Sequence, residues 1–141
     1  RRNLEPTGDN LGKLMLELRE KNGPGAIAVL LTEPIKNSQS KVIIIDGVRS
    51  TAEIEVLKNV GSVKLLSIEA TADTRYKFLS SRGRSDDPTT REKFEERDNR
   101  ELGVGIGESI AIADETISNS GITLDELAEL ASKAIEKWIE T

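Results

Sequence analysis

Apolar residues recur along much of the chain at the three- and four-residue spacing of amphipathic helices. The first predicted helix covers residues 9–21, with Asp9 as its cap and Gly23 as its stop. The second begins at Pro24 and is disturbed by Pro34, which lacks a backbone donor. The same spacing, with Ser, Thr and Glu at capping positions, predicts further helices over residues 50–60, 71–82, 89–101, 106–113 and 123–138.

Unbroken apolar runs predict buried strands at residues 41–46 and 63–68, and a shorter strand lies at 115–118. Such runs suit strands that are covered on both faces, as in a parallel sheet. The helix between the first two strands opens with a capping box, Ser50 with Glu53, and completes a βαβ unit. The sequence therefore predicts a single α/β domain over residues 1–141.

Three strands are few for so many helices, because sheets of this kind normally have about five. The shortage fits a strand and helix that are absent from the amino-terminal side. Because the chain opens at Arg1 and its only methionine is Met15, we expect such a segment upstream.

Asp46 and Arg49 follow directly after the 41–46 run. Ligands of open α/β sheets bind beyond the carboxyl ends of the strands. There, a carboxylate can hold a hydrated Mg²⁺, and a guanidinium can bind phosphate with two parallel hydrogen bonds. The alternative is that Asp46 and Gly47 simply make a good turn.

Residues 82–101 form a highly charged segment in which 13 of 20 positions carry charge and the single large apolar residue is Phe94. Thr89 and Glu92 predict a capping box for a mostly exposed helix that stands off the domain. Residues 82–103 would then be a lid-like insertion that closes over polyphosphate. The alternative is a solvated helix with ion pairs four residues apart. The basic residues of this segment are Arg82, Arg84, Arg91, Lys93, Arg97 and Arg100.

The composition narrows the chemistry. The 25 acidic and 20 basic residues give a net charge of −5, which argues against a general nucleic-acid or anionic-membrane surface but allows a local basic pocket. The chain has no Cys and no His, so chemistry must rely on carboxylates, Lys, Arg, hydroxyls or Mg²⁺. No apolar run approaches the ~20 residues that span a bilayer and no signal peptide is visible, so we expect a cytoplasmic protein.

Three motifs together resemble P-loop nucleotide kinases. Residues 45–50, Ile-Asp-Gly-Val-Arg-Ser, are similar to the Asp-Gly-Phe-Pro-Arg segment of adenylate kinase, with the proline missing and the loop one residue shorter. Residues 84–87, Arg-Ser-Asp-Asp, resemble the Arg-x-Asp-Asp run of the adenylate kinase lid, and Arg97 is the counterpart of a later helical arginine. Residues 113–121 resemble the Ala-Asp-x-x-Ile-x-Asn-x-Gly stretch of dephospho-coenzyme A kinase.

The chain is similar in particular to an archaeal adenylate-kinase-related family. This resemblance implies a three-layer P-loop NTPase fold whose first strand and Gly-rich phosphate loop lie upstream of residue 1. It also implies transfer of a phosphoryl group from ATP, with Mg²⁺, to a nucleotide or small phosphorylated metabolite. Without the phosphate loop, the 141 residues should catalyse poorly.

By this resemblance, Arg49 would hold the acceptor phosphate and Asp46 would hold the metal or orient the acceptor. The other expected catalytic residues are Arg84 and Arg97, and the expected nucleotide-binding residues are Arg82, Asn119 and Gly121. Two alternatives stay open: a nucleotide-responsive binding module without turnover, and a truncated or degenerate homologue with a structural role. The oligomeric state and the acceptor are not fixed by the sequence.

Overall fold

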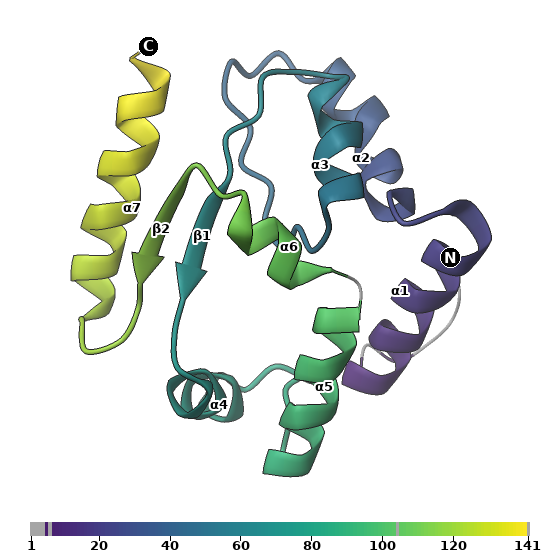
Figure 1. Cartoon of the computed structure of the whole chain (residues 1–141), viewed down its shortest axis with the longest axis vertical. Coiled ribbons are helices and arrows are strands. Elements are labelled where there is room, and N and C mark those ends of the chain that lie inside the picture. Colours follow the sequence, from purple (N-terminus) through teal and green to yellow (C-terminus); the bar gives the residue numbers. More distant parts are fainter. Residues whose placement is uncertain (1–4, 6, 104, 141) are drawn as a thin grey trace.

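Helices make up most of the structure, a computed structural model that describes residues 5, 7–103 and 105–140 (Figure 1). Two short strands accompany them in this described part. The α/β class predicted from the apolar pattern is confirmed. In chain order the elements are α1 (Gly8–Asn22), α2 (Ala26–Asn37), α3 (Thr51–Lys58), β1 (Leu66–Glu69), α4 (Ala72–Ser81), α5 (Arg91–Gly103), α6 (Ile106–Ala111), β2 (Glu115–Ser118) and α7 (Leu124–Ile139).

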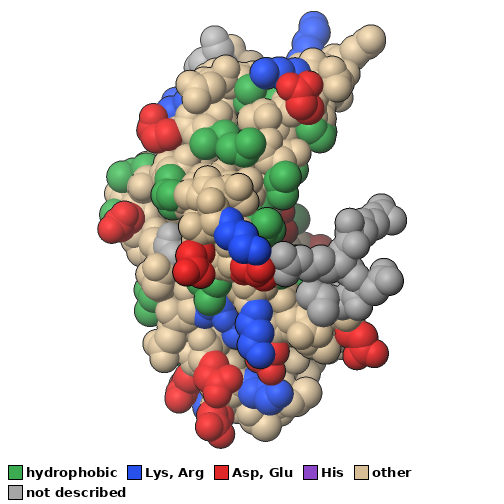
Figure 2. All heavy atoms as spheres, turned by 90° about the vertical axis from the view of Figure 1, so that its right-hand side faces the viewer, with side chains coloured by type: hydrophobic (Ala, Val, Ile, Leu, Met, Phe, Trp, Pro, Cys, Tyr) green, Lys and Arg blue, Asp and Glu red, His purple; other side chains and the backbone are tan. Residues whose placement is uncertain are grey.

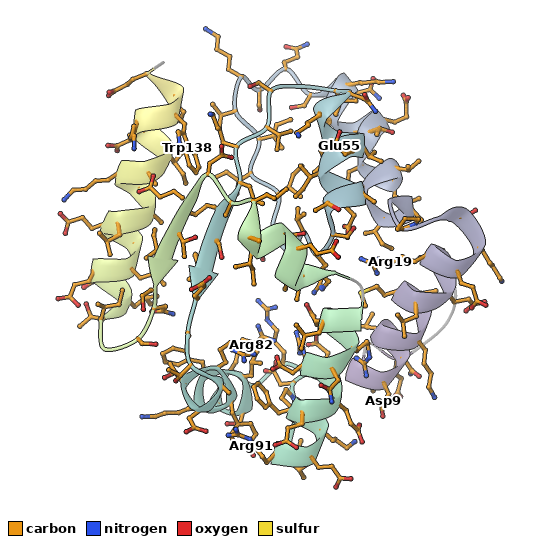
Figure 3. The ribbon with its side chains drawn as sticks, viewed as in Figure 1. Asp9, Arg19, Glu55, Arg82, Arg91 and Trp138 are labelled. Carbon is orange, nitrogen blue, oxygen red and sulfur yellow. The ribbon has the colours of Figure 1, made fainter. Side chains whose placement is uncertain are left out.

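The two strands pair in parallel, as the buried apolar runs predicted. Leu66 lies opposite Glu115 and Glu69 opposite Ser118, and the crossover between the strands carries α4, α5 and α6. A backbone bond from Asn119 N to Glu69 O, 2.6 Å long, continues the ladder past the strand ends. Helix α7 packs along β2 (Figure 1). Figure 3 shows Trp138 on the side of α7 that faces the strands.

Side-chain caps fix the starts of several helices where the sequence predicted them. Ser50 accepts a hydrogen bond from Glu53 N at 3.3 Å, and this bond opens α3. Thr123 and Glu126 form both bonds of a capping box at the start of α7, with lengths of 3.1 and 2.7 Å. Caps of this kind depend only on neighbouring residues, which is why sequence alone finds them.

Three helix boundaries differ from the prediction. Thr7, not Asp9, caps α1, because its hydroxyl accepts from Asn10 N at 3.2 Å. Thr90, not Thr89, accepts from Lys93 N at 3.2 Å at the start of α5. Pro34 does not end α2, which continues to Asn37. A proline in a helix leaves one carbonyl without its donor, and water can bond that group on an exposed face.

The predicted strand at residues 41–46, here called the 41–46 segment, is wrong as a strand of this chain. Its residues lie in irregular, mostly exposed backbone, and Val42, Ile43 and Ile44 expose 46%, 42% and 76% of their surface. No backbone hydrogen bond joins residues 41–46 to the rest of the described chain. A β-strand needs a neighbouring strand for its hydrogen bonds, and the described chain places none beside this segment. The second predicted strand also begins three residues late, at Leu66.

The charged segment packs more closely than the sequence indicated. Phe94 of α5 is 2% exposed, and its ring meets that of Tyr76 on α4 edge to face, with centroids 5.4 Å apart. The guanidinium groups of Arg75 and Arg91 each lie 5.3 Å from the Phe94 ring centre, and Figure 3 shows Arg91 where α4 and α5 meet. The prediction that this helix stands off the domain is therefore wrong. One aromatic anchor with stacked arginines suffices to dock it.

A further small core lies between α2 and α3, where Ala26, Ala28, Ile54 and Leu57 are buried. Small residues on α2 allow the two helices to approach closely. No helix within the described ranges is long and apolar enough to cross a bilayer.

Candidate functional site

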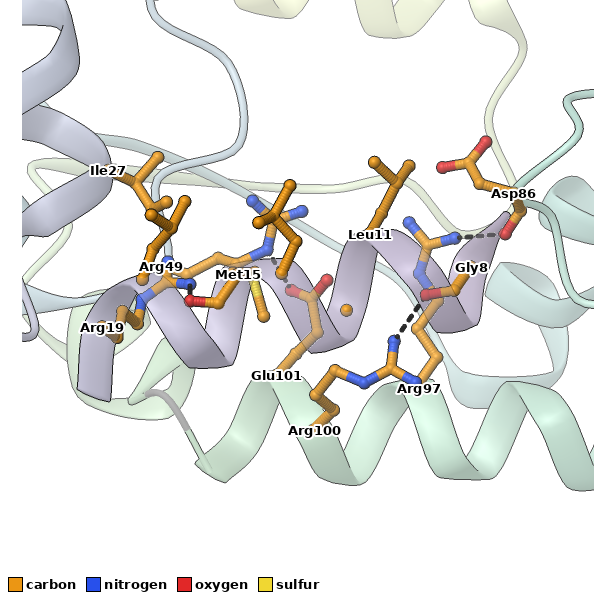
Figure 4. A pocket seen from close by; sticks show the side chains of 13 residues that line it. Gly8, Leu11, Met15, Arg19, Ile27, Arg49, Asp86, Arg97, Arg100 and Glu101 are labelled. Atoms are coloured by element: carbon orange, nitrogen blue, oxygen red, sulfur yellow. Dashed lines mark hydrogen bonds and ion pairs between the residues drawn. The ribbon is translucent and has the colours of Figure 1, made fainter. Parts of the chain in front are cut away.

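The main candidate site is a cavity of about 280 Å³ that α1 and α5 line together with the loop before α3 (Figure 4). One wall is apolar and the other is charged. We call this cavity the arginine pocket. Its apolar lining residues are Leu11, Leu14, Met15, Leu18 and Ile27, its charged ones are Arg19, Arg49, Asp86, Arg97, Arg100 and Glu101, and Gly8 and Gly12 complete it.

Four arginines face two acids in this pocket, although the chain as a whole has a net charge of −5. They come from α1, from the loop that leads into α3, and from α5. On the face of the molecule shown in Figure 2, charged side chains of both signs gather in the lower half, and apolar ones are more frequent above. A local excess of guanidinium groups in an acidic protein favours an anionic ligand at that place.

The backbone at Gly47 holds Arg49, which lines the pocket. Gly47 has φ +85°, a left-handed conformation that glycine adopts without strain. Its carbonyl accepts a hydrogen bond from Arg49 Nη1 at 2.6 Å, and Arg49 Nε donates to Glu101 Oε2 at 2.9 Å. The Gly47 carbonyl and the α5 carboxylate therefore hold this guanidinium through two different nitrogens.

Two arginines one turn apart on α5 extend the charged wall. Arg97 Nη1 donates to Asp86 O at 3.5 Å, and Arg100 Nη1 donates to Gly8 O at 3.2 Å. Both acceptors are neutral carbonyl groups. Arg100 Nη2 lies 3.9 Å from Asp9 Oδ1, a long and partly exposed ion pair. These two guanidinium groups therefore keep much of their charge available to a ligand.

Gly12 allows Arg100 to lie against α1. A β-carbon at position 12 would stand 2.2 Å from Arg100 Nη1, so the guanidinium would have to move away. Because only the flexible end of Arg100 occupies this space, the absence of a side chain at position 12 shapes the pocket more than it shapes the fold.

Arg19 forms the buried end of the pocket. Its Nη2 lies 2.9 Å from Glu53 Oε1, and the two side chains are 8% and 5% exposed. The Ser50 hydroxyl donates to the same carboxylate oxygen at 3.1 Å. Arg19 Nε has no hydrogen-bond partner among the described residues. This pair joins α1 to α3, whose cap Ser50 directly follows Arg49 in the chain, so the capping residues of α3 also support the pocket.

The predicted lid residues Arg82 and Arg84 form a turn outside this pocket. Arg82 Nε donates to Asp87 Oδ1 at 2.9 Å, and the backbone N of Arg84 donates to Asp87 Oδ2 at 2.8 Å. The hydrogen bond from Arg82 lowers the pKa of Asp87, with the Arg84 backbone bond as a weaker cause. The same bond raises the pKa of Arg82, and the charge of Asp46 adds to that rise. Figure 3 shows Arg82 between α4 and the strands.

Asp46 lies outside the arginine pocket and lines a second, mostly apolar cavity of about 540 Å³ with Ile35, Ile44 and Ile45. No group of three or more His, Cys, Asp or Glu side chains placed to hold a metal ion occurs in the described ranges. A single exposed carboxylate fits a hydrated Mg²⁺ that takes its other ligands from water and phosphate. The metal role of Asp46 stays a prediction.

Asn119 and Gly121 follow β2 and also lie outside the arginine pocket. Gly121 has φ +73°, and the neighbouring Ser120 hydroxyl accepts from Thr71 N at 3.4 Å. The structure thus places these residues at the carboxyl end of the two-stranded sheet, where a nucleotide base was expected. Their role in nucleotide binding stays a prediction.

Sequence reasoning placed Arg49 and Arg97 in the site and counted Arg100 among the basic residues of the lid, but it missed Arg19 and Glu101. The α5 residues carried a usable signal, because positions 97, 100 and 101 share one helix face. Arg19 carried none. A basic residue in the last turn of a helix is expected there on dipole grounds alone.

Comparison with known proteins shows the family. No protein-family model matches the chain. The UPF0200 protein of Hyperthermus butylicus is 36% identical over 137 residues, which cover 97% of this chain and 73% of that protein. The UPF0200 protein of Pyrococcus abyssi is 40% identical over 124 residues, and that of Pyrococcus horikoshii is 35% identical over 147 residues.

The matches leave part of each relative uncovered. The chain spans 66% of the Pyrococcus abyssi protein and 78% of the Pyrococcus horikoshii protein. The names of these relatives state no reaction, so the resemblance to adenylate kinase stays a prediction. The archaeal part of the resemblance is confirmed. At these identities, and with these shares of both chains covered, the chain belongs to the UPF0200 family of archaeal proteins.

Proposed function

We propose that the arginine pocket binds the phosphate of a small phosphorylated molecule, and that this chain is the acceptor-binding part of an ATP-dependent phosphotransferase. One observation carries the proposal: Arg19, Arg49, Arg97 and Arg100 line one cavity of an otherwise acidic chain. The apolar wall made by α1 and α2 suits the non-phosphate part of such a molecule. A nucleotide or a phosphorylated metabolite has both parts.

Phosphoryl transfer depends mainly on positioning and charge neutralisation. Arg49 holds the acceptor phosphate, since a hydrogen bond to the Gly47 carbonyl fixes its guanidinium. Arg97 and Arg100 add charge from α5, while Arg82 and Arg84 approach from the lid turn. Asp46 holds a hydrated Mg²⁺, an ion that neutralises the donor phosphates when it is bound with ATP. Asn119 and Gly121 border the adenine.

We also propose that the complete protein has a P-loop NTPase fold. The 41–46 segment is apolar and lacks backbone partners in the described chain. Within the described residues, β1 pairs with β2 on one edge and has no strand on its other edge. Ile68 of β1 is 51% exposed. These features support one more parallel strand that pairs with both elements and leads into the donor-phosphate loop. The relatives are long enough to supply it, because the matches leave a quarter or so of their length uncovered.

Calorimetric titration with AMP tests the pocket. We expect Arg49→Ala to weaken binding about tenfold to a hundredfold, because a charge-assisted, paired hydrogen bond to phosphate is lost. Lys58→Ala on α3 removes the same charge at an exposed site and should leave the dissociation constant within about twofold. Equal effects of the two variants, or no binding by the parent chain, contradict the proposal.

Transfer itself needs a chain extended to the length of its relatives. That chain should form ADP from Mg²⁺-ATP when the correct phosphorylated acceptor is present. Saturable AMP binding without turnover in any acceptor screen would instead favour a nucleotide-responsive binding module.

A further inference from the structure

Glu101 is an acid inside a pocket that otherwise gathers arginines. It lies on α5, next to Arg100 and one turn after Arg97, and its carboxylate accepts from Arg49 Nε at 2.9 Å. In Figure 4 it projects between the two ends of the pocket and points at Arg49. The Arg49 and Glu101 side chains are 28% and 19% exposed, so solvent screens their ion pair only in part.

The contacts of Arg49 with Glu101 and Gly47 occupy two of the five N–H donors of its guanidinium, including the Nε donor. Arg49 gives Nε to Glu101 and Nη1 to the Gly47 carbonyl. A guanidinium binds phosphate best through two parallel N–H groups. A ligand therefore reaches the Nε edge of Arg49 only when the Glu101 carboxylate withdraws.

We infer that Glu101 is an internal competitor for the anion site, which the ligand phosphate displaces from Arg49. The inference rests on the proposed function, because it concerns the same pocket. In the free protein, the carboxylate compensates the charge of Arg49 and ties α5 to the loop before α3. On binding, the phosphate replaces that carboxylate and Glu101 is released. Ligand binding thereby breaks the contact between these two elements.

A competing internal contact lowers the apparent affinity to the intrinsic affinity multiplied by the fraction of molecules in the open state. Glu101→Gln removes the negative charge with little change in size. We expect this variant to bind phenyl phosphate about threefold to tenfold more tightly, because a partly exposed ion pair contributes on that scale. Glu95→Gln on the exposed side of α5 makes the same charge change and should alter the dissociation constant by less than about twofold.

The test is an NMR titration of phenyl phosphate into the chain and four variants, namely Glu101→Gln, Glu95→Gln, Arg49→Ala and the double variant Arg49→Ala/Glu101→Gln. In the Arg49→Ala background, Glu101→Gln should give no gain, since the competition is gone. Unchanged or weaker binding by Glu101→Gln, or a gain that persists without Arg49, overturns the inference. If the parent chain and Glu101→Gln both fail to bind, the proposed function fails instead.

Discussion

Arg49 of the arginine pocket closely follows the 41–46 segment along the chain, yet the pocket side chains have partners among the described residues and the backbone of the segment does not. The Arg49 guanidinium bonds the Gly47 carbonyl and the Glu101 carboxylate, and Arg19 is buried against Glu53. Four residues before Arg49 along the chain, the apolar run has no backbone partner among the described residues. Most of the pocket consists of side chains on helices, whose backbone hydrogen bonds are internal, whereas a strand depends on backbone groups from elsewhere.

The largest expected effect on stability comes from a substitution at the buried end of the pocket. Arg19→Met should lower the free energy of unfolding by about 3–5 kcal/mol, because it leaves the buried Glu53 carboxylate without its cation. Urea unfolding measures this change. Arg19→Met/Glu53→Leu removes both charges and should recover much of the loss. If the single variant is as stable as the parent chain, the buried pair does not support the pocket.

Alanine substitutions of two isoleucines compare the packed α2–α3 core with the 41–46 segment. Ile54→Ala in the α2–α3 core should cost about 2–5 kcal/mol, whereas Ile44→Ala in the 41–46 segment should cost less than about 0.5 kcal/mol. In a chain extended to the length of its relatives, the cost of Ile44→Ala should rise to about 2 kcal/mol or more. A cost that stays small in the longer chain argues against an additional strand beside this segment.

Gly12→Ala should separate the pocket from the fold. Its β-carbon displaces the guanidinium of Arg100, so AMP binding should weaken about threefold to tenfold. Stability should stay the same or rise by up to about 1 kcal/mol, because alanine favours helix more than glycine does. Gly107→Ala in α6, where the nearest atom is 4.0 Å away, serves as the control. Unchanged binding by Gly12→Ala removes Arg100 from the site.

The smallest expected effect concerns the lid turn. The folded-state pKa of Asp87 is lowered from its ordinary value of 3.8 by the Arg82 hydrogen bond, so the bond stabilises the fold above that pH. This stabilisation is lost as the pH falls through the folded-state value. The stability difference between the parent chain and Asp87→Asn should therefore shrink below pH 3.8. A difference that is independent of pH contradicts the ion-pair origin.

Local rules explain which features the sequence predicted well. The caps at Ser50 and Thr123 depend on residues three positions away; the capping box at Thr123 formed as predicted, while at Ser50 the hydroxyl caps the helix and the Glu53 carboxylate bonds Arg19 and the Ser50 hydroxyl. The same rules failed for the 41–46 segment because its pattern specifies a strand but not a partner. Arg100 reaches the pocket only because position 12 carries no side chain, a tertiary fact that spacing along one helix does not contain.

The central claim is that the arginines of the pocket bind the acceptor phosphate. Titration of AMP while recording the Nε–Hε NMR signals of all arginines tests it most directly. The account predicts that the signals of Arg49, Arg97 and Arg100 shift together and saturate with one dissociation constant, while that of Arg91, stacked on Phe94, stays in place. Saturable shifts confined to arginines outside the pocket, or no saturable shift, would contradict it.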